Sequence, residues 1–136
     1  MAANNWNHGV IEEFRANGGQ VAAFEGRTLL LLHTTGAKSG QPRVTPLVYQ
    51  PVESGYAVFA SKAGAPTNPD WYHNLLASPH VTVEVGAETV EVIARVADPA
   101  ERDQIWNRQK QAFPNFAEYE QKTSRTIPVV ILEANA

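Results

Sequence analysis

The sequence has no cysteine, a single methionine and no long apolar run. The absence of cysteine excludes disulfide bonds, thiolate metal sites and a cysteine nucleophile. Apolar runs such as residues 29–32 are far shorter than the roughly 20 residues that a membrane-spanning helix needs. Residues 1–10 lack the basic start and apolar core of a signal peptide. We therefore expect a soluble, cytoplasmic protein.

Acidic residues are scarce in one part of the chain. Between residues 26 and 69 the only acid is Glu53, against four basic residues: Arg27, Lys38, Arg43 and Lys62. The whole chain has a net charge of −3 and a pI of about 5.8, which argues against nucleic-acid binding. A locally basic segment in an acidic protein indicates a small anionic ligand rather than a long polyanion.

The composition fits one domain spanning residues 1–136, because hydrophobic residues make up 43% of the chain and charged residues 18%. Short apolar or alternating runs predict strands joined mostly as hairpins. These runs are residues 28–34, 44–52, 55–61, 81–85, 89–96 and 128–132. Pro46 and Pro51 lack the N–H group that a sheet ladder uses, so we expect the second strand at an edge or a bulge.

Residues 4–17 have the periodicity of a helix, with Trp6, Val10 and Phe14 on one face and a glycine pair at residues 18–19 to end it. One interpretation is a helix packed on the core. The others are a lid formed by residues 1–19, or a helix at a membrane surface. The two glutamates within this helix weaken its attraction to anionic lipid.

Two further helices are marked by their start signals. Asn68 is predicted as an N-cap with Pro69 at the first helical position, and Asp98 opens a capping box. A short helical turn is expected after Pro114. Hairpins and helices together predict an α+β fold: a mainly antiparallel barrel with helices packed outside, spanning residues 26–132.

Several common motifs are missing. Ala37 precedes Lys38-Ser39 where a P-loop needs glycine, and no Rossmann fingerprint or G-x-S-x-G elbow occurs. The four histidines have no metal-binding spacing, so we predict no metal site.

Two loops carry the remaining chemistry. In the first, Lys38 and Arg43 flank Gly40, so a hairpin can present N–H groups and two cations to a phosphate. In the second, residues 60–74, small side chains suit a flat ring and Gly64 lets the backbone approach a ligand. Spacing alone also allows two ordinary polar turns.

The run TTGAKSGQPRVTPL, followed by SKAGAPTNPDWYHNL and VTVEVG, resembles the deazaflavin-dependent nitroreductase family of actinobacterial flavin/deazaflavin oxidoreductases. The resemblance covers roughly residues 26–132. It implies a split β-barrel of the FMN-binding type. It also implies binding of coenzyme F420, a 5-deazaflavin with a phosphate-containing oligoglutamate tail, and hydride transfer from its reduced form.

The resemblance assigns roles to matching positions. It implies that Lys38, Ser39 and Arg43 hold the phosphate region of F420, and that Thr45 and Pro46 lie near the ring and its linker. Two further segments are implied to complete the cofactor pocket. They are the segment at the polar edge of the ring (Ser61, Lys62, Ala63 and Gly64) and the helix start (Asn68, Pro69, Trp71 and Asn74).

The sequence departs from the family on the substrate side. Prodrug-reducing members carry tyrosines in the segment that matches Phe113, Phe116 and Tyr119, and another where this chain has Val48. A pocket formed by these four residues is more apolar and favours a quinone over a bicyclic nitroimidazole. Ser61 is a candidate to hydrogen-bond the acceptor or the ring, and Tyr119 a candidate to protonate the product.

The resemblance favours an F420H2-dependent oxidoreductase that reduces a small, flat, apolar acceptor such as a quinone or a nitro compound. Three alternatives stay open. The same barrel could use FMN, the protein could carry F420 without turnover, or the N-terminal helix could serve a lipid- or quinone-handling protein at the inner face of the plasma membrane. A homodimer is a further expectation, because related split barrels often dimerise.

Overall fold

The computed structural model describes residues 5–21, 29–65 and 67–134. Within them, six strands form a closed antiparallel barrel in the order β1-β2-β3-β6-β5-β4, and β4 pairs with β1. The strands are β1 (Leu29–Thr35), β2 (Pro42–Val52), β3 (Gly55–Phe59), β4 (His80–Val85), β5 (Glu88–Val96) and β6 (Val129–Ala134). The predicted antiparallel barrel with external helices is confirmed.

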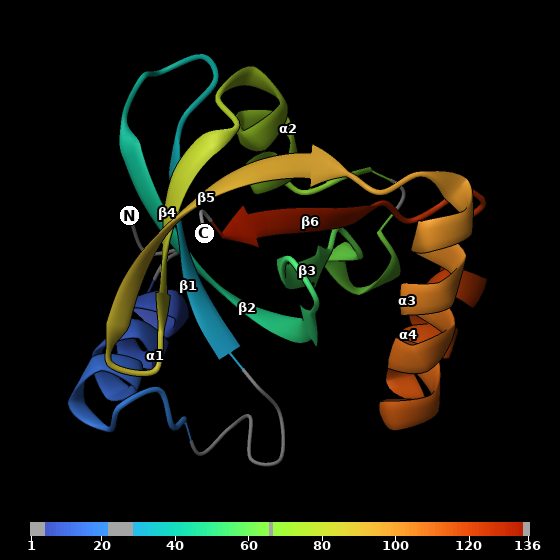
Figure 1. The fold of residues 1–136 in the computed structure, drawn as a ribbon, viewed down its shortest axis with the longest axis horizontal. Coiled ribbons are helices and arrows are strands. Elements are labelled where there is room, and N and C mark those ends of the chain that lie inside the picture. Colours follow the sequence, from blue (N-terminus) through green and yellow to red (C-terminus); the bar gives the residue numbers. More distant parts are fainter. Residues whose placement is uncertain (1–4, 22–28, 66, 135–136) are drawn as a thin grey trace.

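Helices cover the outside and one end of the barrel. They are α1 (Asn5–Ala16), the 3-10 turn η3 (Lys62–Gly64), α2 (Asp70–Ala77), α3 (Pro99–Ala112) and α4 (Asn115–Lys122). Figure 1 shows α1 at one side of the barrel, α3 and α4 at the other, and α2 at the top. The predicted short turn after Pro114 is the helix α4.

The continuous leucine run of β1 is explained by burial on both faces. Leu30 and Leu32 point into the barrel core, whereas Leu29 and Leu31 join a second cluster beneath α1. Strand β6 divides in the same way between the barrel core and a third cluster beneath α3 and α4. A strand that is buried on both faces needs no polar alternation.

Helix α1 packs on the barrel. Val10 and Phe14 are 4% and 1% exposed and lie against Leu29 and Leu31. These two side chains are therefore not available to lipid or to an open cleft. The structure supports the first interpretation of this helix, in which it packs on the core. The side chain of Trp6 lies outside the described residues. No described helix is long and apolar enough to cross a membrane.

The prolines of β2 lie where the sheet tolerates them. Residues 42–48 pair with β1 and residues 49–52 pair with β3, so within the described residues each part of β2 has a partner on one side. β2 is not an edge strand as predicted, because it lies between β1 and β3 in the closed barrel, but Pro46 and Pro51 each have a ladder partner on one side only.

The start of α2 differs from the prediction. Pro69, not Asn68, is the N-cap residue, and no side chain caps this helix. The Asn68 side chain instead accepts a hydrogen bond from Arg125, at 2.7 Å. The predicted cap of α3 is confirmed, because Asp98 accepts from the Glu101 N–H at 2.9 Å.

Candidate functional site

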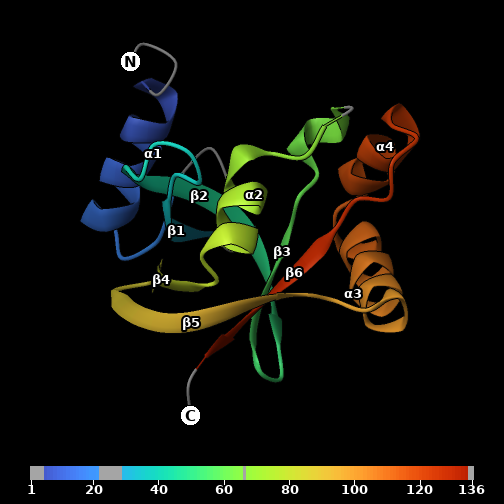
Figure 2. The ribbon, with the colours of Figure 1, turned by 90° about the horizontal axis from the view of Figure 1, so that it is seen from above.

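A groove of about 550 Å³ lies between the β1–β2 loop and α2. One wall comes from the loop and its strand (Gly36, Ala37, Lys38, Ser39 and Arg43), the other from α2 (Asp70, His73 and Asn74). Figure 2 shows that the β1–β2 hairpin and α2 lie side by side at one end of the barrel. The structure thus brings together four residues predicted for the cofactor: Lys38, Ser39, Arg43 and Asn74.

The loop wall is held in shape by its own hydrogen bonds. Gly36 donates its N–H to the Gln41 carbonyl at 2.8 Å and accepts from the Gly40 N–H at 2.9 Å. The Ser39 hydroxyl accepts from the Gln41 N–H at 3.2 Å. Gly40 has φ +71°, a conformation that favours glycine. The loop is therefore a closed turn with Lys38 and Ser39 at its tip.

Asn74 joins the two walls. It is 6% exposed, its Oδ1 accepts from the Ala37 N–H at 2.9 Å, and its Nδ2 lies 3.5 Å from Thr34 Oγ1. The buried amide uses both of its ends to fix the loop against α2. In this structure Asn74 therefore positions the groove rather than exposing its amide to a ligand.

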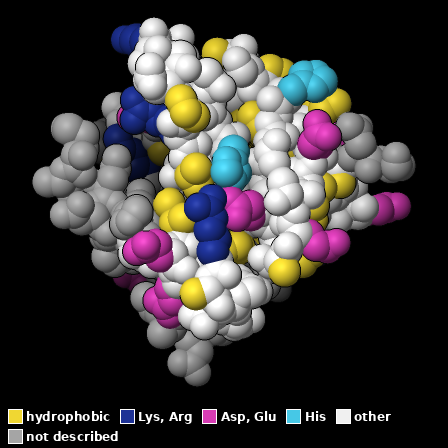
Figure 3. All heavy atoms as spheres, turned by 90° about the vertical axis from the view of Figure 1, so that its left-hand side faces the viewer, with side chains coloured by type: hydrophobic (Ala, Val, Ile, Leu, Met, Phe, Trp, Pro, Cys, Tyr) yellow, Lys and Arg dark blue, Asp and Glu magenta, His cyan; other side chains and the backbone are white. Residues whose placement is uncertain are grey.

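The groove carries more positive than negative charge. Among the described residues, neither Lys38 nor Arg43 forms an ion pair, and Asp70 on the opposite wall is the only carboxylate that lines the groove. In Figure 3, the basic side chains lie mostly toward the upper left of this face, whereas the acidic ones are spread over its right and lower parts. Two unpaired cations on a closed turn fit a phosphate-bearing ligand such as the tail of F420.

The predicted ring-edge segment forms a second cluster, beside α4. Gly64 has φ +84°, and a Cβ there would lie 2.8 Å from both the Tyr119 carbonyl oxygen and Lys122 Cβ. The bare face of Gly64 thus allows close packing of η3 on α4. Lys62 is exposed, and its Nζ reaches Thr67 Oγ1 at 3.4 Å. The side chain of Ala63 lies outside the described residues.

Arg125 clamps this second loop. Its three guanidinium nitrogens donate to the Ser61 carbonyl at 2.9 Å, the Ala65 carbonyl at 3.0 Å and Asn68 Oδ1 at 2.7 Å. Burial lowers the pKa of Arg125. The segment that leads from β3 into α2 is therefore fixed to the chain that follows α4.

Other residues predicted to bind the cofactor pack within the fold and do not line the groove. Trp71 is 7% exposed and packs in the barrel core, and Pro69 is buried at the helix start. Thr45 and Pro46 are half-buried on β2, paired with Leu32 and Leu31.

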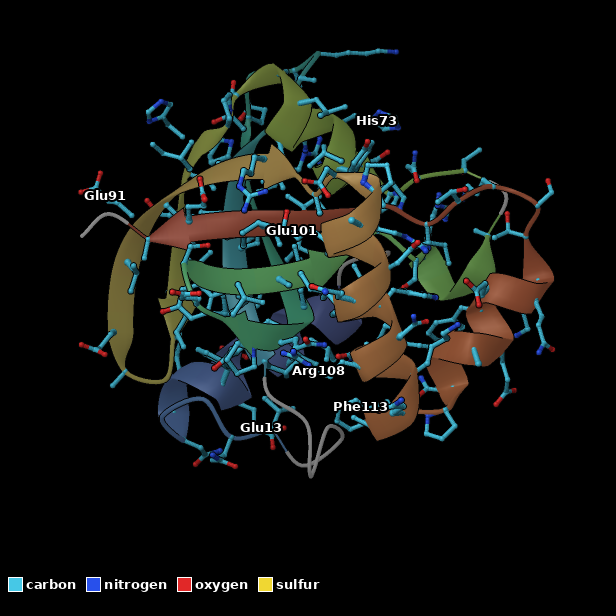
Figure 4. All side chains as sticks on the ribbon, turned by 45° about the vertical axis from the view of Figure 1, so that its right-hand side comes forward. Glu13, His73, Glu91, Glu101, Arg108 and Phe113 are labelled. Atoms are coloured by element: carbon cyan, nitrogen blue, oxygen red, sulfur yellow. The ribbon has the colours of Figure 1, made fainter. Side chains whose placement is uncertain are left out.

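Of the four residues predicted for the acceptor pocket, Phe113, Phe116 and Tyr119 share the cluster beneath α3 and α4, whereas Val48 lies elsewhere. Phe116 is 5% exposed, with its ring 5.4 Å from Phe59 and 5.9 Å from Trp106, so it belongs to the core beneath α3 and α4. Val48 packs against the cluster beneath α1. Figure 4 shows Phe113 at the lower end of α3, far from His73 on α2 at the top.

Tyr119 remains as the substrate-side residue that lies near a predicted cofactor segment. It is half-buried, its backbone lies against Gly64, and its hydroxyl accepts from Asn115 Nδ2 at 3.0 Å. Phe116 stacks edge-on against it, with ring centroids 5.3 Å apart. The neighbouring aromatic ring restricts the orientation of the phenol.

Three residues that line the groove or hold the second loop were not predicted from the sequence: Asp70, His73 and Arg125. Asp70 and His73 had a usable signal, because residues spaced i, i+3 and i+4 with Asn74 share one face of a helix. Arg125 had none, since its partners precede it by 57 to 64 positions.

Comparison with known proteins defines the class first. A solved F420-H2 dependent reductase (FDR-A) is 44% identical, with a TM-score of 0.68 over 77% of this chain and 93% of that one. A solved chain described as a domain-swapped dimer is 38% identical, with a TM-score of 0.71 over 96% and 99%. The barrel thus has the fold of the F420-dependent reductases.

The family follows from the sequence comparisons. Residues 7–134 match the model of the F420H(2)-dependent quinone reductase family. The F420H(2)-dependent quinone reductase Rv1261c of Mycobacterium tuberculosis is 44% identical over 106 residues, which are 76% of this chain and 71% of that protein. The chain belongs to this family, and the predicted enzyme class, oxidoreductase, and the predicted cofactor, F420, are confirmed.

Proposed function

We propose that this protein reduces a quinone with hydride from F420H2, and that the cofactor's phosphate region binds in the groove between the β1–β2 loop and α2. The observation that carries the proposal is the pair of cations, Lys38 and Arg43, which have no carboxylate partner among the described residues and line one groove. A family named for F420H2 supplies the matching anionic ligand.

The bound cofactor supplies the hydride, from C5 of its reduced deazaflavin ring. Lys38 and Arg43 bind and orient the phosphate region through charge-assisted hydrogen bonds. The segment from Ser61 to Gly64 would border the ring, because it leads into α2, which also forms a wall of the groove. The protein thereby fixes the ring without taking part in covalent chemistry.

The acceptor is a flat, apolar molecule such as a quinone, with a nitro compound as a second substrate class. Of the four pocket residues expected from the sequence, we retain Tyr119, because it lies beside Gly64. Its hydroxyl accepts a hydrogen bond from Asn115, which leaves its own proton available to donate to an acceptor oxygen. Ser61 can donate a hydrogen bond to the acceptor or to the ring.

The first experiment titrates the purified protein with F420 and, in parallel, with FMN, following tryptophan fluorescence. We expect tight binding of F420 and weak binding of FMN. Lys38→Ala and Arg43→Ala should each weaken F420 binding by about 1.5–3 kcal/mol, as expected for one charge-assisted contact. Lys110→Ala is the matched control, because Lys110, near the end of α3, pairs with Glu120 of α4 and does not line the groove. Unchanged affinity in both groove variants would remove the groove from the proposal.

The second experiment separates an enzyme from a carrier. F420H2 oxidation is followed with and without menadione, a simple quinone. A reductase oxidises F420H2 at a rate that depends on the quinone, whereas a carrier binds F420H2 and leaves that rate unchanged. Tyr119→Phe and Ser61→Ala then test the two side chains, and full turnover in either variant excludes that side chain from proton or hydrogen-bond donation.

We also propose a homodimer, supported by the relative described as a domain-swapped dimer, which this chain matches over 96% of its length. Light scattering on the eluting protein measures the mass in solution. A mass equal to the 14.9 kDa chain at all concentrations would exclude the dimer.

A further inference from the structure

Arg125 directs its whole guanidinium group at one loop. Nε binds the Ala65 carbonyl at 3.0 Å, Nη1 binds Asn68 Oδ1 at 2.7 Å, and Nη2 binds the Ser61 carbonyl at 2.9 Å. All three acceptors lie within residues 61–68, which connect β3 to α2. A planar fork with fixed donor directions therefore sets the relative positions of three points on this loop.

The bonding of Arg125 differs from that of the ion-paired arginines of this protein. The hydrogen bonds that Arg95 donates to the carboxylates of Glu101 and Glu133 raise the pKa of Arg95, whereas burial lowers the pKa of Arg125. Among the described residues no carboxylate contacts Arg125. A partly buried cation without a counter-charge is unfavourable unless its donors are satisfied, and here neutral loop oxygens satisfy them. The side chain is thus placed to shape the loop.

The loop needs such support, because its backbone is unusual. Lys62 has φ +46°, a left-handed conformation that is unfavourable for a residue with a side chain. Gly64 has φ +84° and packs against the Tyr119 carbonyl. Two short turns, from the Gly64 N–H to Ser61 O at 2.9 Å and from the Ala65 N–H to Lys62 O at 3.0 Å, close the segment. Strained conformations persist where the surroundings over-determine them.

We propose that Arg125 is a positioning residue for the reductase. It holds residues 61–68 in the shape that receives the deazaflavin ring, acting through the loop and not by contact with the substrate. This inference rests on the proposed function. It predicts that the fork geometry of arginine is needed, and that a positive charge alone is not enough.

The first test needs no cofactor. Hydrogen–deuterium exchange is measured on the amides of Gly64 and Ala65 in wild type, Arg125→Lys and Arg125→Ala. We expect exchange to be faster by about tenfold or more in both variants, because two to three charge-assisted bonds are lost. Arg102→Ala is the matched control: Arg102 Nε also donates to a backbone carbonyl, that of Ile127 at 3.0 Å, yet none of its described hydrogen bonds reaches residues 61–68. Its exchange at the loop should equal that of wild type.

The second test uses the cofactor. Arg125→Ala should raise the Kd for F420 by about tenfold and lower kcat with menadione, and Arg125→Lys should recover little of either, because one ammonium cannot serve three separated acceptors. Added ethylguanidinium should restore part of the affinity in Arg125→Ala. If Arg125→Ala does not fold, Arg125→Lys carries the test.

The outcomes separate this inference from the proposed function. Wild-type protein that neither binds F420 nor oxidises F420H2 refutes the proposed function, and this inference with it. Active wild type together with unchanged loop exchange in Arg125→Lys overturns the positioning role alone. Faster exchange with wild-type affinity and kcat overturns it equally, because the shape of the loop would then not matter to the cofactor.

Discussion

Replacement of Asn74 by alanine is the sharpest test of how the groove is built. The Asn74 amide is 6% exposed and links the two walls through Ala37 and Thr34. In the variant, the Ala37 N–H loses its only described partner, and the loop that carries Lys38 loses its attachment to α2. We therefore expect a loss of stability and a weaker affinity for F420 in the same protein.

The size of the effect follows from the two bonds. The bond to the Ala37 N–H is short, at 2.9 Å, while the bond to Thr34 Oγ1 is marginal, at 3.5 Å. Loss of the bond to Ala37, together with loss of the partner of the buried Thr34 hydroxyl, amounts to about 1–3 kcal/mol of unfolding free energy. For a chain of this size that corresponds to a fall in Tm of about 4–10 °C. The affinity for F420 should fall by about tenfold, because a loosened loop must be ordered on binding.

Two further variants assign the effect to one bond. Asn74→Asp retains the acceptor for Ala37 but adds a negative charge beside Lys38, so it should preserve Tm better than alanine and still weaken F420 binding. Thr34→Val removes only the marginal bond and should leave both quantities near wild type. Calorimetry gives Tm and cofactor fluorescence gives Kd. An Asn74→Ala protein with wild-type Tm and Kd would refute the positioning role of this amide.

Two further predictions concern stability. Hydrogen bonds from Arg15, the larger cause, and from His33 lower the pKa of the Glu84 carboxyl in the folded protein. The unfolded chain therefore binds a proton at Glu84 more readily than the folded one. The stabilisation is present above the ordinary pKa of 4.5 and is lost as the pH falls through the lower pKa of the folded state. Unfolding by urea between about pH 3 and pH 7 should show wild type and Glu84→Gln converging at the acidic end, and a constant difference would contradict this. Gly64→Ala should destabilise more than Gly40→Ala, because both have positive φ but only Gly64 meets backbone within 3 Å of a new Cβ. Equal losses would show that the contact with α4 is not tight.

The fold was largely predictable because local and long-range signals agree. Alternating runs and glycine turns mark the hairpins β1–β2, β2–β3 and β4–β5, which the structure contains. The three pairs that close the barrel, β1 with β4, β3 with β6 and β5 with β6, join strands distant in sequence. No turn chemistry specifies such pairs, since they depend on which buried faces fit together.

The site was predictable on one wall and not on the other. The absence of acids between Gly36 and Arg43 pointed to the loop wall, because it leaves Lys38 and Arg43 without a carboxylate nearby in the sequence. The acceptor side was harder. The sequence does not show whether an aromatic residue of this helix faces a pocket or the core. Phe116 is part of the core because α4 packs it against Phe59.

Both loops of the site are fixed through the helix α2, and this explains how separate sequence motifs form one functional unit. Arg125 holds Asn68, just before the helix, and Asn74 within the helix holds the β1–β2 loop. The helix itself is anchored by Trp71 and Leu75 in the barrel core. The separation of the β1–β2 loop, proposed to bind the phosphate, from the loop before α2, proposed to border the ring, is therefore set by core packing, which is stiff, rather than by the loops themselves. The buried tryptophan next to Asp70 thus contributes to the site by holding the helix in place, without needing to touch the cofactor.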